Sequence, residues 1–196
     1  MQQLIEQIMN RIFIELEASG RHVHLTKEAA LSLFGHSLTE KRPLSQPGQF
    51  VCNERVTIIG EKGRFENVAV LGPERNACQV ELSMTDCVTL GVRAPVRQSG
   101  STQDTPGITL ECEGRELTLS GGVIVAQRHI HMTPEDAKMR NLQDGDLVKL
   151  RTFTARPVVF EDVTVRVSPH FRTYVHLDYD EANACGFSKG DLGMLI

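Results

Sequence analysis

A short motif occurs twice in this chain and constrains its fold more than any other feature. Arg21-His22-Val23-His24-Leu25-Thr26 returns 107 residues later as Arg128-His129-Ile130-His131-Met132-Thr133, so the two copies hold four of the seven histidines. Successive side chains of an extended strand point to opposite faces, so the two histidines of each copy share one face. Neutral imidazole is a common ligand of divalent transition metals, and each pair therefore predicts half of a metal site.

The repeat extends beyond the histidines. Phe65 to Val70 aligns with Phe160 to Val165 at an offset of 95 residues, and the same offset aligns Glu81 with His176. Self-similarity of this kind predicts two copies of one structural unit, in which Glu81 and His176 supply the third ligand of each site. The offset falls from 107 to 95 because the first copy holds extra residues, which we place in a predicted surface loop at 36–50.

Each histidine pair is followed by a helix signal. Thr26-Lys27-Glu28 and Thr133-Pro134-Glu135 both lead into helix-favouring sequence, with threonine in the N-cap position and acids in the first turn. Both units are therefore predicted to run from a histidine strand into a short helix.

Composition excludes several classes of protein. The 196 residues are 40% hydrophobic, so the chain can bury a sizeable core, and its net charge of −4 leaves no basic stripe for nucleic acid. No apolar run approaches the 18 to 20 residues, roughly, that span a bilayer. Five cysteines without Cys-x-x-Cys spacing predict neither a disulfide framework nor a cysteine zinc cluster. We expect a soluble, cytoplasmic protein without nucleic-acid or membrane partners.

The remaining pattern is mainly β. Residues 12–17 alternate with a period of two, and many short apolar segments with glycine-containing turns follow as far as Leu177, which is typical of β sandwiches and barrels. Leu4, Ile5 and Ile8 recur at helical spacing, so Met1 to about Arg11 is predicted to be a short amphipathic helix. That helix could pack on the protein body or serve as a docking tail.

Separated segments of the chain together resemble one known family. They agree in order with the PduL-type phosphate acyltransferases, the phosphate propanoyltransferase family, over nearly the whole chain from about Ile14 onward. The matching segments are residues 21–26, 69–75, 79–83, 94–100, 105–108, 122–124, 128–133 and 175–183.

The resemblance implies two small β-barrels related by pseudo-symmetry, with short helices and an exchanged N-terminal strand. One barrel domain would comprise residues 1–20 plus 127–196, and the other residues 21–126. The family's two-metal centre, normally of zinc although other divalent metals would also fit, maps residue by residue onto this chain. Its ligands fall on His22, His24 and Glu81 for one ion and on His129, His131 and His176 for the other.

The resemblance also implies an activity. Members transfer a short acyl group, propanoyl or acetyl, reversibly between coenzyme A and orthophosphate, and Arg75 matches the arginine that holds phosphate. Arg21 and Arg128, beside the ligands, could bind the phosphates of coenzyme A or pair with carboxylates. Many members form homo-oligomers and work inside bacterial microcompartments, so the N-terminal segment is a candidate shell contact.

Three other functions fit part of the pattern. One is a non-catalytic metal-binding scaffold with both sites fully ligated, but three protein ligands per ion leave positions open, which favours catalysis. A cupin-like metal-binding module would use Glu28 and Glu135 as ligands, since each glutamate follows a His-x-His pair by four residues. Helix capping explains these glutamates better, because helix formation would carry them away from the face of the strand. A metal-dependent hydrolase built on a (β/α)₈ barrel would need about 250 residues, more than this chain has.

Overall fold

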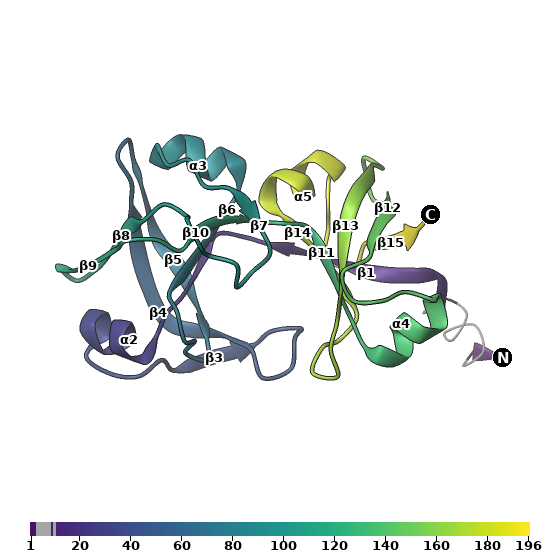
Figure 1. The fold of residues 1–196 in the computed structure, drawn as a ribbon, viewed down its shortest axis with the longest axis horizontal. Helices are drawn as coiled ribbons and strands as arrows, with labels where there is room; N and C mark the ends of the chain where they lie inside the picture. The colour runs from purple at the N-terminus through teal and green to yellow at the C-terminus, as the bar shows by residue number, and fades with distance from the viewer. Residues whose placement is uncertain (3–8, 10) are drawn as a thin grey trace. The chain divides into compact units, whose positions relative to one another are not determined.

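The computed structural model describes residues 1–2, 9 and 11–196, and most of the predicted N-terminal helix at Met1 to Arg11 lies outside them. The described chain divides into two compact units, Met1–Ser19 with Gln127–Ile196 and Gly20–Ala126. Strands dominate both units (Figure 1), so the predicted mainly β fold is confirmed. Among the described residues, no helix is both long enough and apolar enough to cross a membrane.

The first unit is a closed six-stranded barrel. Its hydrogen-bonded order is β1 (Phe13–Ser19), β14 (Tyr174–Asp178), β11 (His129–Met132), β13 (Val159–Val167), β12 (Leu147–Phe153) and β15 (Leu192–Leu195). The N-terminal strand β1 completes a barrel otherwise made from the C-terminal part of the chain, as expected. Alternate residues of these strands, such as Leu16, Ile130 and Val175, fill the interior, where each buried aliphatic side chain contributes about 1.5 to 3 kcal/mol.

Closure of the barrel depends on one close approach. Gly193 of β15 faces the interior, and a Cβ at this position would lie 2.7 Å from Leu150 Cδ1 and 3.0 Å from Leu16 Cδ2. Glycine is therefore the residue that lets β15 pair with both β1 and β12. Two short helices, α4 (Pro134–Arg140) and α5 (Tyr179–Cys185), follow β11 and β14.

The second unit is an open half-barrel. Its sheet runs β7 (Val96–Arg97), β10 (Val123–Ala126), β6 (Gln79–Leu82), β2 (His22–His24), β5 (Arg64–Gly72), β4 (Phe50–Ile59), β8 (Ile108–Cys112) and β9 (Arg115–Leu119). In the stretch 20–126, all of which is described, β7 and β9 do not pair with each other, so this sheet does not close as the first does. Helices α2 (Lys27–Phe34) and α3 (Met84–Leu90) follow β2 and β6. Strand β3 (Glu40–Pro43), paired with β4, lies within the segment predicted to be loop.

Internal duplication is visible at the backbone. Asn67 in β5 and Asp162 in β13, which the sequence alignment makes equivalent, both have a positive φ, 58° and 53°. The pairing register shifts beside each of them, between Val56 and Ile58 of β4 and between Val148 and Leu150 of β12. Each is thus a β-bulge whose left-handed residue is Asn or Asp, the side chains that tolerate this conformation best.

The predicted threonine caps are also present in both units. Thr26 Oγ1 accepts from Ala29 N, and Thr133 Oγ1 accepts from Asp136 N, each at 3.1 Å. Both helices therefore begin directly after a histidine strand, which fixes the orientation of that strand at its C-terminal end.

Candidate metal centre

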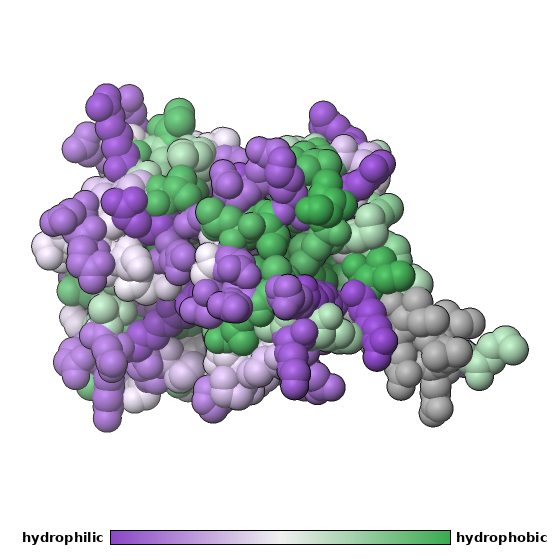
Figure 2. Space-filling view, turned by 45° about the vertical axis from the view of Figure 1, so that its right-hand side comes forward, coloured by the Kyte–Doolittle hydropathy of each residue, from purple (hydrophilic) through white to green (hydrophobic). Residues whose placement is uncertain are grey.

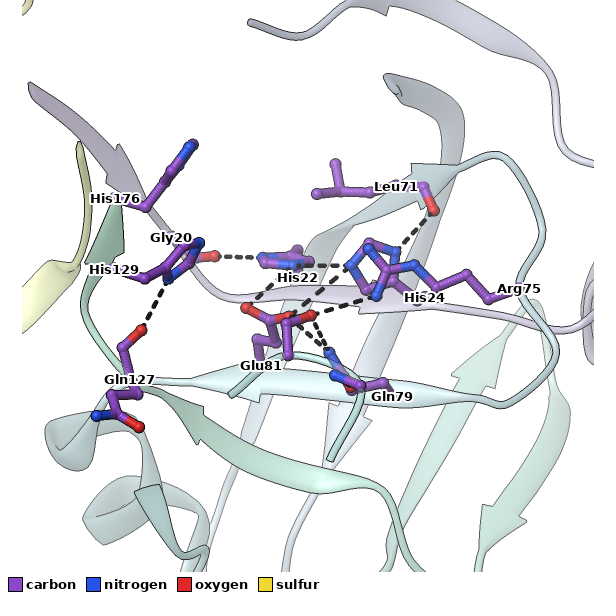
Figure 3. Close-up of polar contacts among 12 residues, drawn as sticks. Gly20, His22, His24, Leu71, Arg75, Gln79, Glu81, Gln127, His129 and His176 are labelled. Carbon is purple, nitrogen blue, oxygen red and sulfur yellow. Dashed lines mark hydrogen bonds and ion pairs between the residues drawn. The ribbon is translucent and has the colours of Figure 1, made fainter. Parts of the chain in front are cut away.

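The first ligand group lies on two neighbouring strands of the half-barrel. His22 of β2 is the antiparallel register partner of Glu81 of β6, while Val23 between the histidines is buried in the core. Alternation then places His22, His24 and Glu81 on the other face of the sheet, where their ligand atoms all lie within 4.8 Å of one another. Figure 3 shows the three side chains pointing toward one another. We call this group the first triad.

The first triad is compact and buried. His22 Nε2 lies 3.2 Å from His24 Nε2 and 3.5 Å from Glu81 Oε2, and His24 Nε2 lies 4.0 Å from Glu81 Oε1. The three residues are 6%, 2% and 7% exposed. Two imidazoles and one carboxylate at this separation are a donor set that fits zinc and related divalent metals.

Backbone carbonyls orient both imidazoles of the first triad. His22 Nδ1 lies 2.8 Å from Gly20 O, and His24 Nδ1 lies 3.3 Å from Leu71 O. A carbonyl oxygen can only accept, so each Nδ1 carries a proton and Nε2 is the ligand atom of the neutral ring. This arrangement fixes the tautomer and the ring plane, as the outer contacts of metal-binding histidines usually do. Burial alone would lower the pKa of His22, but the neighbouring Glu81 raises it, so a metal ion at this site would displace a proton.

The charges of the first triad are coupled. Burial alone would raise the pKa of Glu81, but the neighbouring His22 and His24 and a hydrogen bond from Ser99 hold it well below its usual range. Burial, followed by the nearby His22 and Arg75, lowers the pKa of His24 well below its ordinary value. Glu81 is therefore ionised and His24 neutral, the forms in which both side chains bind metal.

Two polar side chains that sequence reasoning missed contact Glu81, and one of them also contacts Arg75. Gln79 Nε2 donates to Glu81 Oε1 at 2.6 Å and Ser99 Oγ donates to the same oxygen at 2.7 Å. Arg75 Nη1 donates to Ser99 Oγ at 3.3 Å, so the arginine predicted to bind phosphate is connected to the first triad through Ser99. These contacts place Arg75 at the edge of a cavity of about 420 Å³ whose lining includes Cys78, Gln79 and Gly100.

The second ligand group lies on the outer face of the barrel. His129 of β11 is the antiparallel register partner of His176 of β14, while Ile130 and Val175 are buried in the core. The ligand atoms of His129, His131 and His176 lie within 4.8 Å of one another. We call this group the second triad. His129 Nδ1 lies 2.8 Å from Gln127 O, so it is oriented in the same way as His22.

Comparison with known proteins shows which family the chain resembles. The family model described as phosphate propanoyltransferase matches residues 15–188. The phosphate propanoyltransferase of Enterococcus faecalis is 52% identical over 100% of this chain and 97% of its own length. Those of Clostridioides difficile and Salmonella typhimurium are 50% and 48% identical, over 99% and 88% of this chain and 96% and 83% of their own lengths.

The chain belongs to the phosphate propanoyltransferase family. This family consists of phosphate acyltransferases, so the expected enzyme class is confirmed and takes the place of the cupin-like and hydrolase alternatives. The structure agrees, because Glu28, which a cupin would use as a ligand, is exposed in the first turn of α2.

The arginines beside the family's histidine motif contact carboxylates. Arg21 Nη2 pairs with Asp86 Oδ1 at 2.6 Å and its guanidinium lies 4.0 Å from the centre of the Phe65 ring. Arg128 Nη1 pairs with Glu181 Oε1 at 2.8 Å. Both arginines therefore pair with carboxylates in the structure, and their binding of coenzyme A phosphates stays a prediction.

Of the two residues that contact Glu81, the sequence could have indicated one but not the other. Gln79 lies two residues before Glu81 on the same strand, so alternation could have placed it on the ligand face. Ser99 lies 18 residues after Glu81, in a connector between strands, and no local pattern links it to that carboxylate. A contact between a loop residue and a distant strand, such as this one, can be identified only in the folded structure.

Proposed function

We propose that this chain transfers a propanoyl or acetyl group reversibly between coenzyme A and orthophosphate, using two zinc ions per chain, one in each triad. The observation that carries the proposal is the pair of triads: three metal-binding side chains, at equivalent positions of two repeated units, in a chain that belongs to the phosphate propanoyltransferase family. The joint use of both ions in one two-metal centre stays a prediction.

The reaction would be a simple exchange at a thioester carbonyl. A phosphate oxygen forms a bond to the carbonyl carbon, the carbon–sulfur bond breaks, and the sulfur leaves as a thiolate that takes up the proton of the phosphate. Acyl-CoA and phosphate thereby become acyl phosphate and free coenzyme A. Bound zinc would supply Lewis acidity for the phosphate and carbonyl oxygens and a soft partner for the thiolate.

The protein's own side chains have distinct tasks in this proposal. His22, His24 and Glu81 would hold one ion, and His129, His131 and His176 the other. Three protein ligands leave coordination positions open, which is the arrangement of catalytic rather than structural zinc.

Arg75 would bind the attacking phosphate. Its planar guanidinium suits two phosphate oxygens at once, and it lies at the edge of a cavity next to the first triad. Ser99 contacts both Arg75 and Glu81, so it would keep the phosphate-binding arginine at a fixed distance from the metal-binding carboxylate.

The partners and location follow from the family and stay predictions. We propose acyl-CoA and orthophosphate as substrates, without nucleic-acid or membrane partners, and a cytoplasmic protein that also enters bacterial microcompartments through its N-terminal segment. A homo-oligomer is supported by exposed hydrophobic side chains of β12 and β13, since apolar surface of this kind often marks an interface. Leu147, Phe153 and Val159 are 60%, 44% and 45% exposed. Figure 2 shows hydrophobic side chains gathered on the face of the molecule that it draws.

Release of coenzyme A from propanoyl-CoA, measured with and without phosphate, tests the proposal. We expect release, with equal formation of acyl phosphate, only when phosphate is present. Arg75→Ala should raise the KM for phosphate about 10- to 100-fold, the range for losing a hydrogen bond to a charged group, and leave the zinc content unchanged. Arg64→Ala, which breaks an exposed pair with Glu66, is the matched control. Thioester hydrolysis that ignores phosphate would contradict the proposal.

A further inference from the structure

A carboxylate lies directly behind one ligand of the second triad. Glu17 of β1 is the parallel register partner of His176, which is in turn the register partner of His129, so the three residues form a row across three adjacent strands. His176 Nδ1 lies 3.4 Å from Glu17 Oε2, and the two side chains are 11% and 35% exposed. Glu17 therefore occupies the outer end of the ligand row.

The equivalent row of the first triad has a different end. There Glu81 is the register partner of both His22 and Ile124 of β10. Ile124 lies 107 residues after Glu17, which is the spacing of the two histidine motifs, and β10 precedes the second motif as β1 precedes the first. Ile124 is fully buried and carries no charge. Each row thus contains one carboxylate: Glu81 as a ligand in one, and Glu17 behind a ligand in the other.

The carboxylate of Glu17 offsets a difference in charge between the third ligands of the two triads. Glu81 brings a negative charge into the first triad, whereas the second triad consists of three imidazoles that bring none when neutral. A carboxylate that accepts the Nδ1 proton of a metal-binding histidine fixes its ring, leaves Nε2 for the ion and strengthens the nitrogen as a donor. Carbonyl oxygens, which carry no full charge, lie beside Nδ1 in His22, His24 and His129.

We propose that Glu17 is a positioning residue of the second triad, holding His176 through Nδ1 and supplying there the negative charge that Glu81 supplies in the first. The inference rests on the proposed binding of zinc by His129, His131 and His176. It concerns a residue that the ligand motif does not contain, because the carboxylate comes from the exchanged strand β1 and not from the strands that carry the histidines.

Zinc affinity of the full-length protein, measured by competition with a chromophoric chelator at constant pH, tests the role of Glu17. Glu17→Ala should lower the affinity for one of the two zinc ions about 10- to 100-fold and leave the affinity for the other unchanged. This is the usual effect of removing a residue that hydrogen-bonds a metal ligand. Glu17→Gln, whose amide oxygen still accepts from Nδ1 without a full charge, should fall between wild type and Glu17→Ala. The visible spectrum of the cobalt-substituted protein should shift in the same order.

Glu15→Gln is the matched control. Glu15 lies two residues earlier on the same face of β1 and accepts a hydrogen bond from the Tyr174 side chain. The amide oxygen of a glutamine still accepts from that hydroxyl, so this replacement should leave both affinities and the cobalt spectrum unchanged. Unchanged affinity of both ions in Glu17→Ala, when wild type binds two, would overturn this inference alone. A wild-type protein that binds no ion at the second triad would overturn both the inference and the proposed metal site. The melting temperature of the zinc-free variants verifies that they fold.

Discussion

Two buried carboxylates show how the surroundings of a single residue decide its charge. Glu81 is 7% exposed and Asp178 is 8% exposed, yet their pKa values shift in opposite directions. Glu81 has two imidazoles beside it, which overcome its burial and keep it ionised. Burial raises the pKa of Asp178 to about 6, and the negative Glu181 and Asp180 add to this shift although backbone hydrogen bonds to the carboxylate oppose it.

The raised pKa of Asp178 predicts that the protein becomes less stable as the pH rises. Folded protein disfavours the charged form, so stability is lost as the pH rises above the unfolded pKa near 4 and through the folded pKa near 6. Asp178→Asn keeps the side-chain oxygen that accepts from Glu181 N and caps α5. In chelator-treated protein we expect this variant to be more stable than wild type by about 1 to 2 kcal/mol at pH 8 and equally stable at pH 4.

Urea unfolding at the two pH values measures this difference. Asp104→Asn, at an exposed position with a left-handed φ of 55° that asparagine tolerates, serves as the control and should change the free energy of unfolding by less than about 0.5 kcal/mol. A difference between Asp178→Asn and wild type that is the same at pH 4 and pH 8 would contradict the assignment.

At the scale of secondary-structure elements, the helices after β6 and β14 are attached to the histidine strands by the same device. Helix α3 begins with a capping box of Ser83 and Asp86, and α5 begins with one of Asp178 and Glu181. The acid at the third helical position in each box also pairs with the arginine that precedes the histidine motif, Arg21 or Arg128. In each unit, one ion pair therefore connects the strand that carries the two motif histidines to the helix that follows the strand of the third ligand.

Removing this connection should destabilise the half-barrel. Asp86→Ala deletes one partner of the capping box and leaves the Arg21 guanidinium without its carboxylate, so we expect the free energy of unfolding to fall by about 2 to 3 kcal/mol. Glu66→Ala, which breaks a pair whose side chains are 65% and 66% exposed, should change it by less than about 0.5 kcal/mol. Chemical denaturation compares the two, and equal effects would show that the Arg21 pair has no special role.

Sequence patterns predicted the elements whose signal is local. Alternation placed the histidine strands, and the threonine caps placed α2 and α4. The helices α3 and α5 were not predicted, although Ser83 and Asp178 are suitable N-caps, because both are short and carry few apolar residues at helical spacing. The strand β3 was missed because all four of its residues are exposed, so no apolar alternation marks it.

At the scale of the whole molecule, duplication made the ligands predictable and divergence limited the rest. Two copies of one pattern nominated all six triad residues, because each copy supports the assignment of the other. Closure of one sheet and opening of the other could not be predicted, since closure depends on long-range pairing such as that of β15 with both β1 and β12. The same divergence places a charged residue at Glu17 where the other unit has Ile124.

We propose that six side chains from two repeated units bind two zinc ions. Zinc content per chain, measured by elemental analysis for wild type, His24→Ala and His131→Ala, tests it most directly. We predict two ions for wild type and one for each variant, because each replacement removes a ligand from one triad only. Circular dichroism verifies that the variants remain folded. A wild-type chain without bound zinc, or variants that both retain two ions, would rule out zinc binding by the two triads.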